Sequence, residues 1–176
     1  MGRVLFVVDA QNDFIGGALG SAEAREAVGR LARLIRDFDG VIFVTQDTHG
    51  GDYMDTQEGK NLPVGHCVKG TEGWALHPDV EAALLGKRVV RIEKPTFGMA
   101  LTGELRARIE REAPEAIEMA GFCTDICVVT NALLLKTAFP EIPVAVDASA
   151  CAGSTPKAHD AALTVLRSCQ VRVRNG

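Results

Sequence analysis

The stretch AIEMAGFCTDICVVTNALLLKTA, residues 116–138, contains the transition that decides the fold. Residues 116–120 form a mainly apolar run of strand length, and Gly121 permits a tight turn after it. Residues 124–138 then show a helical pattern, which Thr124 or Asp125 can cap by accepting hydrogen bonds from free helix amides. A buried strand that leads through a glycine into a capped helix is typical of an α/β unit.

The same alternation of apolar runs and helical patterns extends in both directions. The other apolar runs are 4–8, 41–45, 89–92, 144–146 and 171–173, and the other helical patterns are 22–38, 77–85 (begun at His77–Pro78), 101–112 and 155–168. Runs that are apolar on both faces suit strands covered on both sides. We therefore predict a doubly wound α/β fold with three α/β/α layers and a parallel sheet. No repeat or linker interrupts the pattern, which predicts a single domain over residues 1–176.

Composition and charge narrow the class of protein. The chain is 47% hydrophobic and 24% charged, with a formal net charge of -4, so it lacks the basic footprint of a nucleic-acid-binding protein. The N-terminal apolar run 4–8 is too short for a signal sequence or a membrane span. We expect a cytoplasmic protein with no membrane partner and no organic cofactor.

The five cysteines form an odd set, which argues against a closed disulfide framework. Each thiol is then a core residue, a metal ligand or a nucleophile. Cys151 and Cys169 are interpreted as core or helix-end residues.

Three reactive side chains are expected at the carboxyl edge of the sheet. Asp9 ends the first strand in VVDAQNDF, Lys94 follows the third in RIEKPTF, and Cys127 falls in the first turn of the helix after the fourth. Free amides and the helix dipole there stabilise a thiolate, which makes Cys127 a candidate nucleophile. Asp9 suits an acid/base role and Lys94 a cation that holds the pair. Taken singly, each has a structural alternative: a turn-capping Asp, a solvated Lys and a buried Cys.

Taken together, DAQNDF at 9–14, the Lys after strand three and GFCTDICV at 121–128 resemble the nicotinamidase/isochorismatase-like cysteine hydrolases. The resemblance covers essentially the whole chain. It implies a six-stranded parallel sheet of order 3-2-1-4-5-6 and a catalytic triad of Asp9, Lys94 and Cys127. It also implies a cis peptide at Phe122–Cys123, an oxyanion hole made by the amides of Cys123 and Cys127, and a homo-oligomer. The expected reaction is hydrolysis of a small-molecule amide through a Cys thioester.

The segment 47–76 carries no clear period and follows the second strand, which places it where open α/β sheets bind ligands. Asp47 and His49 match the family's metal-binding D-x-H, and Glu58 and His66 are the candidates to complete the site. This donor set suits a divalent metal such as Zn, Mn or Fe. The alternatives are a polar loop whose side chains cap turns, and a zinc thiolate at Cys67.

The sequence departs from the nicotinamidase pattern at the substrate pocket. Residues 63–65, Pro-Val-Gly, stand where an aromatic residue is expected shortly before the last metal-binding His. Phe14, Phe97 and Trp74 are the candidates for the pocket walls. Nicotinamide, small acyl amides, carbamoyl compounds and ureides therefore all stay open as substrates.

Two further classes of function compete with a hydrolase. One is a non-catalytic small-ligand-binding protein, although a binding protein has no use for the Asp, Lys and Cys set together. The other is a redox sensor in which Cys123 and Cys127 form a disulfide. His159 lies in a polar helical stretch and is interpreted as a solvated residue.

Overall fold

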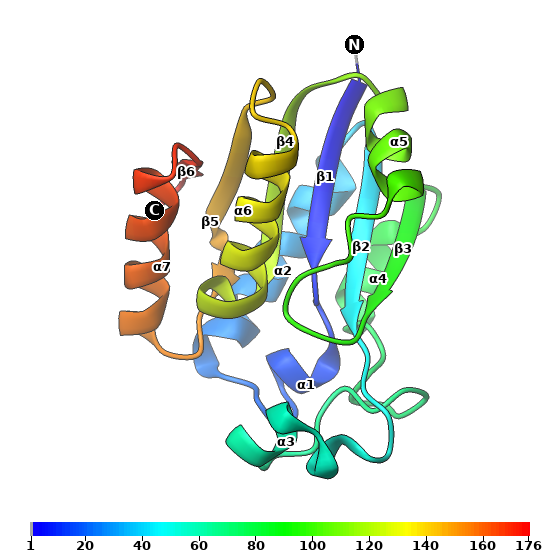
Figure 1. The fold of residues 1–176 in the computed structure, drawn as a ribbon, viewed down its shortest axis with the longest axis vertical. Coiled ribbons are helices and arrows are strands. Elements are labelled where there is room, and N and C mark those ends of the chain that lie inside the picture. Colours follow the sequence, from blue (N-terminus) through cyan, green and yellow to red (C-terminus); the bar gives the residue numbers. More distant parts are fainter. Residues whose placement is uncertain (1) are drawn as a thin grey trace.

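The sheet of this protein has six parallel strands in the order β3-β2-β1-β4-β5-β6, as predicted (Figure 1). A computed structural model describes residues 2–176. The strands are β1 (Gly2–Val8), β2 (Val41–Asp47), β3 (Arg88–Lys94), β4 (Pro114–Phe122), β5 (Val144–Ala152) and β6 (Arg172–Arg174). The helices are α1 (Asn12–Ile15), α2 (Ala22–Asp37), η1 (Tyr53–Asp55), α3 (Gln57–Asn61), α4 (Pro78–Leu84), α5 (Gly103–Arg111), η2 (Thr124–Val128), α6 (Val129–Ala138) and α7 (Pro156–Ser168).

The central strands β1 and β2 form the middle of the core. Residues 4–8 of β1 are fully shielded from solvent, and every residue of β2 is buried. Phe6 and Phe43 are stacked on these neighbouring strands, with ring centroids 4.9 Å apart. Both strands are covered on both faces, which explains why their sequences read as continuous apolar runs.

Helices cover both faces of the sheet. In Figure 1, α5 and α6 lie in front of the strands, whereas α2 and α4 lie behind them. Ser21 caps helix α2, because its hydroxyl accepts a hydrogen bond from the Ala24 amide. The buried side of this helix is apolar. The three-layer arrangement that the sequence predicts is confirmed.

The strands β2 and β3 extend beyond the predicted apolar runs at their carboxyl ends. β2 continues to Asp47 and β3 to Lys94, and these two residues are paired in the sheet. The apolar pattern stops early because these last strand positions hold buried polar side chains. The strand ends meet at the lower end of the molecule in Figure 1, beside α1 and α3.

Two segments differ in detail from what the sequence pattern indicates. The segment 47–76 contains the short helices η1 and α3, and Thr56 caps α3 by accepting a hydrogen bond from the Gly59 amide. A five-residue helix is too short to leave a periodic signal in the sequence. The predicted helix 124–138 is divided, since its first five residues form the π-helical turn η2 and α6 starts at Val129.

Gly121 lies inside β4 rather than in a turn after it. Its φ is +134°, and a Cβ at this position would lie 2.0 Å from the carbonyl oxygen of Val8. The glycine therefore lets β4 approach β1 closely, at the point where the strand order of the sheet reverses.

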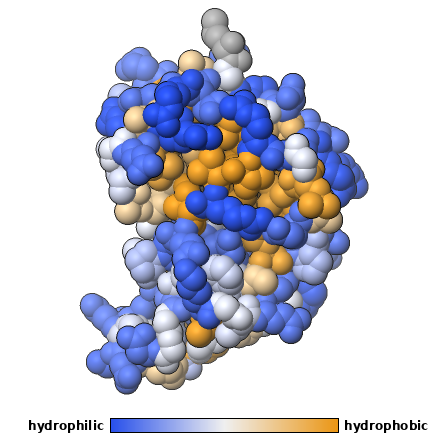
Figure 2. Space-filling view, turned by 90° about the vertical axis from the view of Figure 1, so that its right-hand side faces the viewer, coloured by the Kyte–Doolittle hydropathy of each residue, from blue (hydrophilic) through white to orange (hydrophobic). Residues whose placement is uncertain are grey.

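The side of the molecule that carries β3 and α5 shows apolar side chains between charged ones (Figure 2). Val90, Ile92, Ala100 and Leu105 line a shallow hollow on this side. Within residues 2–176, no helix is both long and apolar enough to cross a membrane.

Candidate active site

Asp9 lies directly after β1 and is completely buried. Its backbone has a φ of +45°, and its amide donates a hydrogen bond to the carbonyl of Thr45 on β2. The Thr45 hydroxyl donates to Asp9 Oδ1 at 2.6 Å. These contacts fix the carboxylate, and its Oδ2 forms a buried ion pair with Lys94.

Lys94 is the last residue of β3, and its side chain is fully buried. Nζ lies 2.7 Å from Asp9 Oδ2, 3.3 Å from Asp47 Oδ1 and 3.6 Å from Cys127 Sγ. The ammonium also donates a hydrogen bond to the carbonyl of Thr96. Burial alone favours the neutral amine, but the charges around Nζ, that of Asp9 above all, raise the pKa of Lys94. Lys94 is therefore a cation that holds the cluster together.

Cys127 lies on the π-helical turn η2 and is 3% exposed. Burial raises the pKa of the Cys127 thiol well above its ordinary value, and the Asp9 carboxylate raises it further. Both effects oppose the thiolate that the sequence predicts at this helix start. Desolvation and the Asp9 charge favour the protonated thiol, whereas the Lys94 ammonium favours the thiolate.

Burial also raises the pKa of Asp9, and the nearby charge of Asp47 adds to this effect while Lys94 opposes it. A buried carboxylate with a raised pKa is a stronger base than a solvated one. Asp9 is thus suited to take the proton of the neighbouring thiol.

The predicted helix caps at Thr124 and Asp125 are also wrong. Neither side chain caps η2; the Thr124 hydroxyl instead bonds with Nδ1 of His159 at 2.8 Å. Asp125 accepts hydrogen bonds from the amide and hydroxyl of Ser154. His159 is therefore not simply solvated, because it ties α7 to the start of the turn that carries Cys127.

The peptide bond Phe122–Cys123 is cis, as the resemblance implied. The Cys123 carbonyl accepts hydrogen bonds from the amides of Ile126 and Val128, which closes the turn around Cys127. Cys123 and Cys127 are both free and buried, and both line the same pocket. Cys151 is a buried core residue on β5, and Cys169 is exposed at the end of α7.

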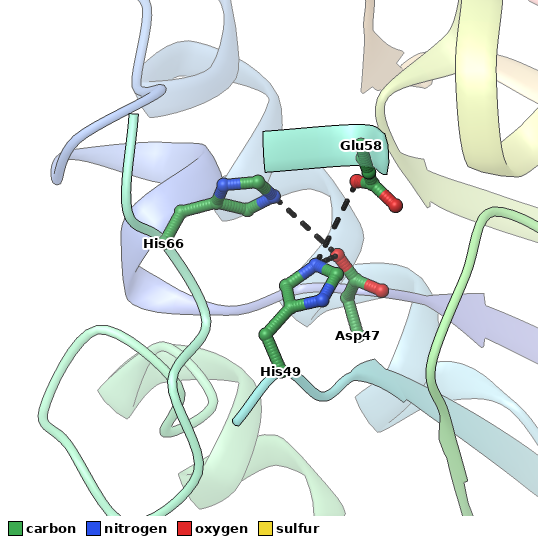
Figure 3. Close-up of side chains that lie close together, drawn as sticks. All are labelled: Asp47, His49, Glu58 and His66. Atoms are coloured by element: carbon green, nitrogen blue, oxygen red, sulfur yellow. Dashed lines mark hydrogen bonds and ion pairs between the residues drawn. The ribbon is translucent and has the colours of Figure 1, made fainter. Parts of the chain in front are cut away.

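The structure brings the four predicted metal ligands together. Figure 3 shows the side chains of Asp47, His49, Glu58 and His66 pointing toward one another from β2, α3 and the intervening loops. One ligand atom from each lies within 4.8 Å of all the others. Asp47 Oδ2 lies 3.0 Å from His49 Nε2 and 3.6 Å from His66 Nε2, and His49 Nε2 lies 3.7 Å from Glu58 Oε1.

The orientation of His66 suits metal binding. Its Nδ1 bonds with the carbonyl of Val64, which leaves Nε2 directed at Asp47. Two imidazoles and two carboxylates around one point are a donor set that Zn, Mn and Fe accept. The residues present therefore fit a divalent metal. Cys67 does not belong to this cluster; its amide donates to Asp13, which holds the loop beside His66.

A pocket connects Cys127 with the metal cluster. It is lined by Phe14, Leu19, Asp47, Glu58, Leu62, His66, Phe97, Cys123, Ile126 and Cys127. Phe14 and Phe97 lie where the sequence placed them, whereas Trp74 is not among these residues. The indole of Trp74 donates to the Thr48 hydroxyl instead. Sequence reasoning missed Leu19, Leu62 and Ile126, since single apolar residues in loops carry no signal of a pocket.

The chain is similar to known proteins over nearly its whole length. Residues 3–175 match the isochorismatase domain family. The chain belongs to the isochorismatase family. The nicotinamidase/pyrazinamidase of Mycobacterium tuberculosis is 27% identical over 146 residues, which cover 72% of this chain and 74% of that protein.

Solved structures of family members show the same fold. The nicotinamidase/pyrazinamidase of Bacillus subtilis superposes with a TM-score of 0.86 at 24% identity, covering 99% of this chain and 100% of that one. The pyrazinamidase of Pyrococcus horikoshii, solved in complex with zinc, gives a TM-score of 0.84 at 24% identity and covers both chains completely. The predicted nicotinamidase/isochorismatase-like resemblance is confirmed.

Proposed function

We propose that this isochorismatase-family protein hydrolyses a small uncharged amide through a thioester on Cys127. The family match and the amidases among its relatives make it a hydrolase that acts on C–N bonds. The observation that carries the finer proposal is the buried contact of Lys94 Nζ with both Asp9 Oδ2 and Cys127 Sγ, at 2.7 and 3.6 Å, beside a pocket that Cys127 lines.

The first half of the reaction forms the thioester. As the sulfur of Cys127 attacks the amide carbon, its proton passes to Asp9, which is why a protonated resting thiol is compatible with catalysis. The amides of Cys123 and Cys127 stabilise the negative charge on the former carbonyl oxygen. Asp9 then returns the proton to the nitrogen, the C–N bond breaks, and ammonia or a small amine leaves.

The second half releases the acid. Asp9 accepts a proton from a water molecule that attacks the thioester carbon, and the C–S bond breaks. The proton returns to the sulfur, so the enzyme regains its starting state. Throughout, Lys94 keeps Asp9 in place and neutralises its charge when the carboxylate is ionised.

Asp47, His49, Glu58 and His66 would hold a divalent metal, and Asp47, Glu58 and His66 line the same pocket as Cys127. A bound metal supplies a Lewis acid for a polar atom of the substrate. The proton transfers above involve only Asp9 and Cys127. The metal cluster therefore contributes to binding and orientation rather than to activation of the thiol.

The pocket walls favour an uncharged substrate. Phe14, Leu19, Leu62, Phe97 and Ile126 form the apolar part of its lining, and no Lys or Arg is among the lining residues. A carbamoyl amino acid would bring a carboxylate against walls that offer no Lys or Arg side chain to pair with it, which is unfavourable. A flat amide with one ring nitrogen or similar acceptor fits both the apolar walls and the metal cluster.

The test is release of ammonia from nicotinamide, pyrazinamide, a carbamoyl amino acid and a ureide. We expect turnover of the first two, and a loss to below about a thousandth of it in Cys127→Ala. Cys169→Ala, a change at the exposed cysteine, is the matched control and should retain full activity. Turnover that survives in pure Cys127→Ala would exclude the thioester, and preference for the carbamoyl acid would overturn the substrate assignment.

A further inference from the structure

Asn131 is a fully buried polar residue on α6, one helical turn after Cys127. Its Nδ2 donates hydrogen bonds to the carbonyls of Cys127 and Phe97, at 2.7 and 3.1 Å. Its Oδ1 accepts the Met99 amide at 2.9 Å. One side chain thus joins the nucleophile-bearing turn to two backbone positions of the segment that follows β3.

That segment, residues 95–99, is seated closely on α6. A Cβ at Gly98 would lie 2.8 Å from Leu134 Cδ1 and 3.0 Å from Thr130 Cγ2, so only glycine allows this approach without a shift. At its other end, Lys94 Nζ donates to the carbonyl of Thr96. Hydrogen bonds to its backbone at Thr96 and Met99 therefore hold the segment near both ends.

Phe97 is the residue of this segment that reaches the pocket. It lines the pocket beside Cys127, yet 44% of it is exposed to solvent. A half-exposed ring has few packing partners to fix its position, so its placement depends on the backbone that carries it. The Asn131 amide bonds that backbone directly at the Phe97 carbonyl.

We infer that Asn131 is a positioning residue that fixes Phe97 as a pocket wall over Cys127, and so sets the affinity for flat amides. The inference rests on the proposed function for its substrate class. Asn131 touches no reacting atom, and it acts through the 97–99 backbone. Its loss should therefore raise KM for an aromatic amide while leaving kcat nearly unchanged.

Asn131→Thr separates the two roles of the side chain. A helical Thr can donate to the carbonyl four residues earlier, as Thr130 does to Ile126. The variant keeps a bond to Cys127 and loses those to Phe97 and Met99. We expect KM for nicotinamide to rise about tenfold, as the loss of a hydrogen-bonded wall predicts, with kcat within about threefold. Thr137→Ala, at an exposed position of the same helix, is the control; Asn131→Ser replaces the variant if Thr does not fold.

A double-mutant cycle with Phe97→Ala distinguishes positioning from general damage. If Asn131 acts through Phe97, Asn131→Thr causes no further rise in KM once the ring is absent. The same fold-rise in both backgrounds, or a fall in kcat alone, would overturn the inference.

A readout without turnover uses alkylation of Cys127 in the Cys169→Ala background. Asn131→Thr should slow the reaction of Cys127 with N-phenyl iodoacetamide about tenfold. The reaction with the smaller reagent iodoacetamide should keep nearly the same rate. If Asn131→Thr slows both reactions equally, or slows neither, Asn131 does not position Phe97 as proposed. If the wild-type protein hydrolyses no amide, the proposed function fails, and this ratio still decides the inference.

Discussion

Replacement of Lys94 with Met tests whether the buried cation holds the catalytic cluster together. Met keeps most of the side-chain volume but removes the ammonium, which lies 2.7 Å from Asp9 and 3.3 Å from Asp47. Two carboxyl groups then face each other in a buried site without a cation. The structure therefore predicts a large loss of stability as well as a loss of activity.

The expected magnitude follows from the burial of all three groups. Removing one partner of a buried ion pair costs about 3–5 kcal/mol, because the remaining charge is uncompensated. In a chain of this size, each kcal/mol lowers the midpoint of thermal unfolding by about 2–4 °C, so the expected fall is about 6–20 °C. Lys69→Met is the matched control, since its ion pair with Glu93 is exposed and should contribute less than about 1 kcal/mol.

The assay is urea and thermal unfolding of both variants in the presence of a chelator, which excludes stabilisation by metal at Asp47. Without Lys94, burial and Asp47 raise the folded-state pKa of Asp9 unopposed. The folded variant then binds a proton more tightly than the unfolded chain, so its unfolding free energy should recover as the pH is lowered from about 8 to about 5. A loss no greater than that of Lys69→Met would refute the buried-cation argument.

Three further predictions concern the metal cluster, a glycine and the thiols. His66→Ala should weaken zinc binding at least about tenfold by calorimetry, whereas His77→Ala, outside the cluster, should not; equal affinity would contradict the ligand set. Gly121→Ala should cost about 2–4 kcal/mol in urea unfolding because its Cβ meets the Val8 carbonyl, and Gly51→Ala, in open space, is the control; an equal cost would contradict the close approach. N-ethylmaleimide at neutral pH should label exposed Cys169 before Cys127 in peptide mass spectrometry, and the reverse order would contradict a protonated resting thiol.

The layers and strand order were predictable because the signals are local and repeated. The runs at 4–8 and 41–45 are apolar on both faces and are the buried centre of the sheet. The short helix α3 was not predictable, because it spans only residues 57–61, depends on one capping contact from Thr56 and leaves no periodic pattern. The three-residue strand β6 was predictable from the apolar run 171–173.

The candidate site was predictable where a reactive residue type lies at the carboxyl end of a predicted strand. Asp9, Lys94 and Cys127 lie at or just after the carboxyl ends of three different strands, and parallel strands bring these ends to one edge of the sheet. The raised pKa of the Cys127 thiol was not predictable, because it depends on burial and on the neighbouring charge of Asp9. Trp74 was misassigned for a similar reason: an aromatic residue near a site in sequence can turn its polar atom to another partner, here Thr48.

Asp47 joins two clusters that the sequence presents as separate. Its Oδ1 faces Lys94 in the triad, and its Oδ2 faces His49 and His66 in the metal cluster. Gln11 holds its backbone on both sides, accepting the Asp47 amide and donating to the Asp47 carbonyl. With the backbone held in this way, the two carboxylate oxygens face different clusters. Asp47 is therefore shared by the two clusters, and its charge acts on Lys94 beside Cys127 as well as on the two imidazoles.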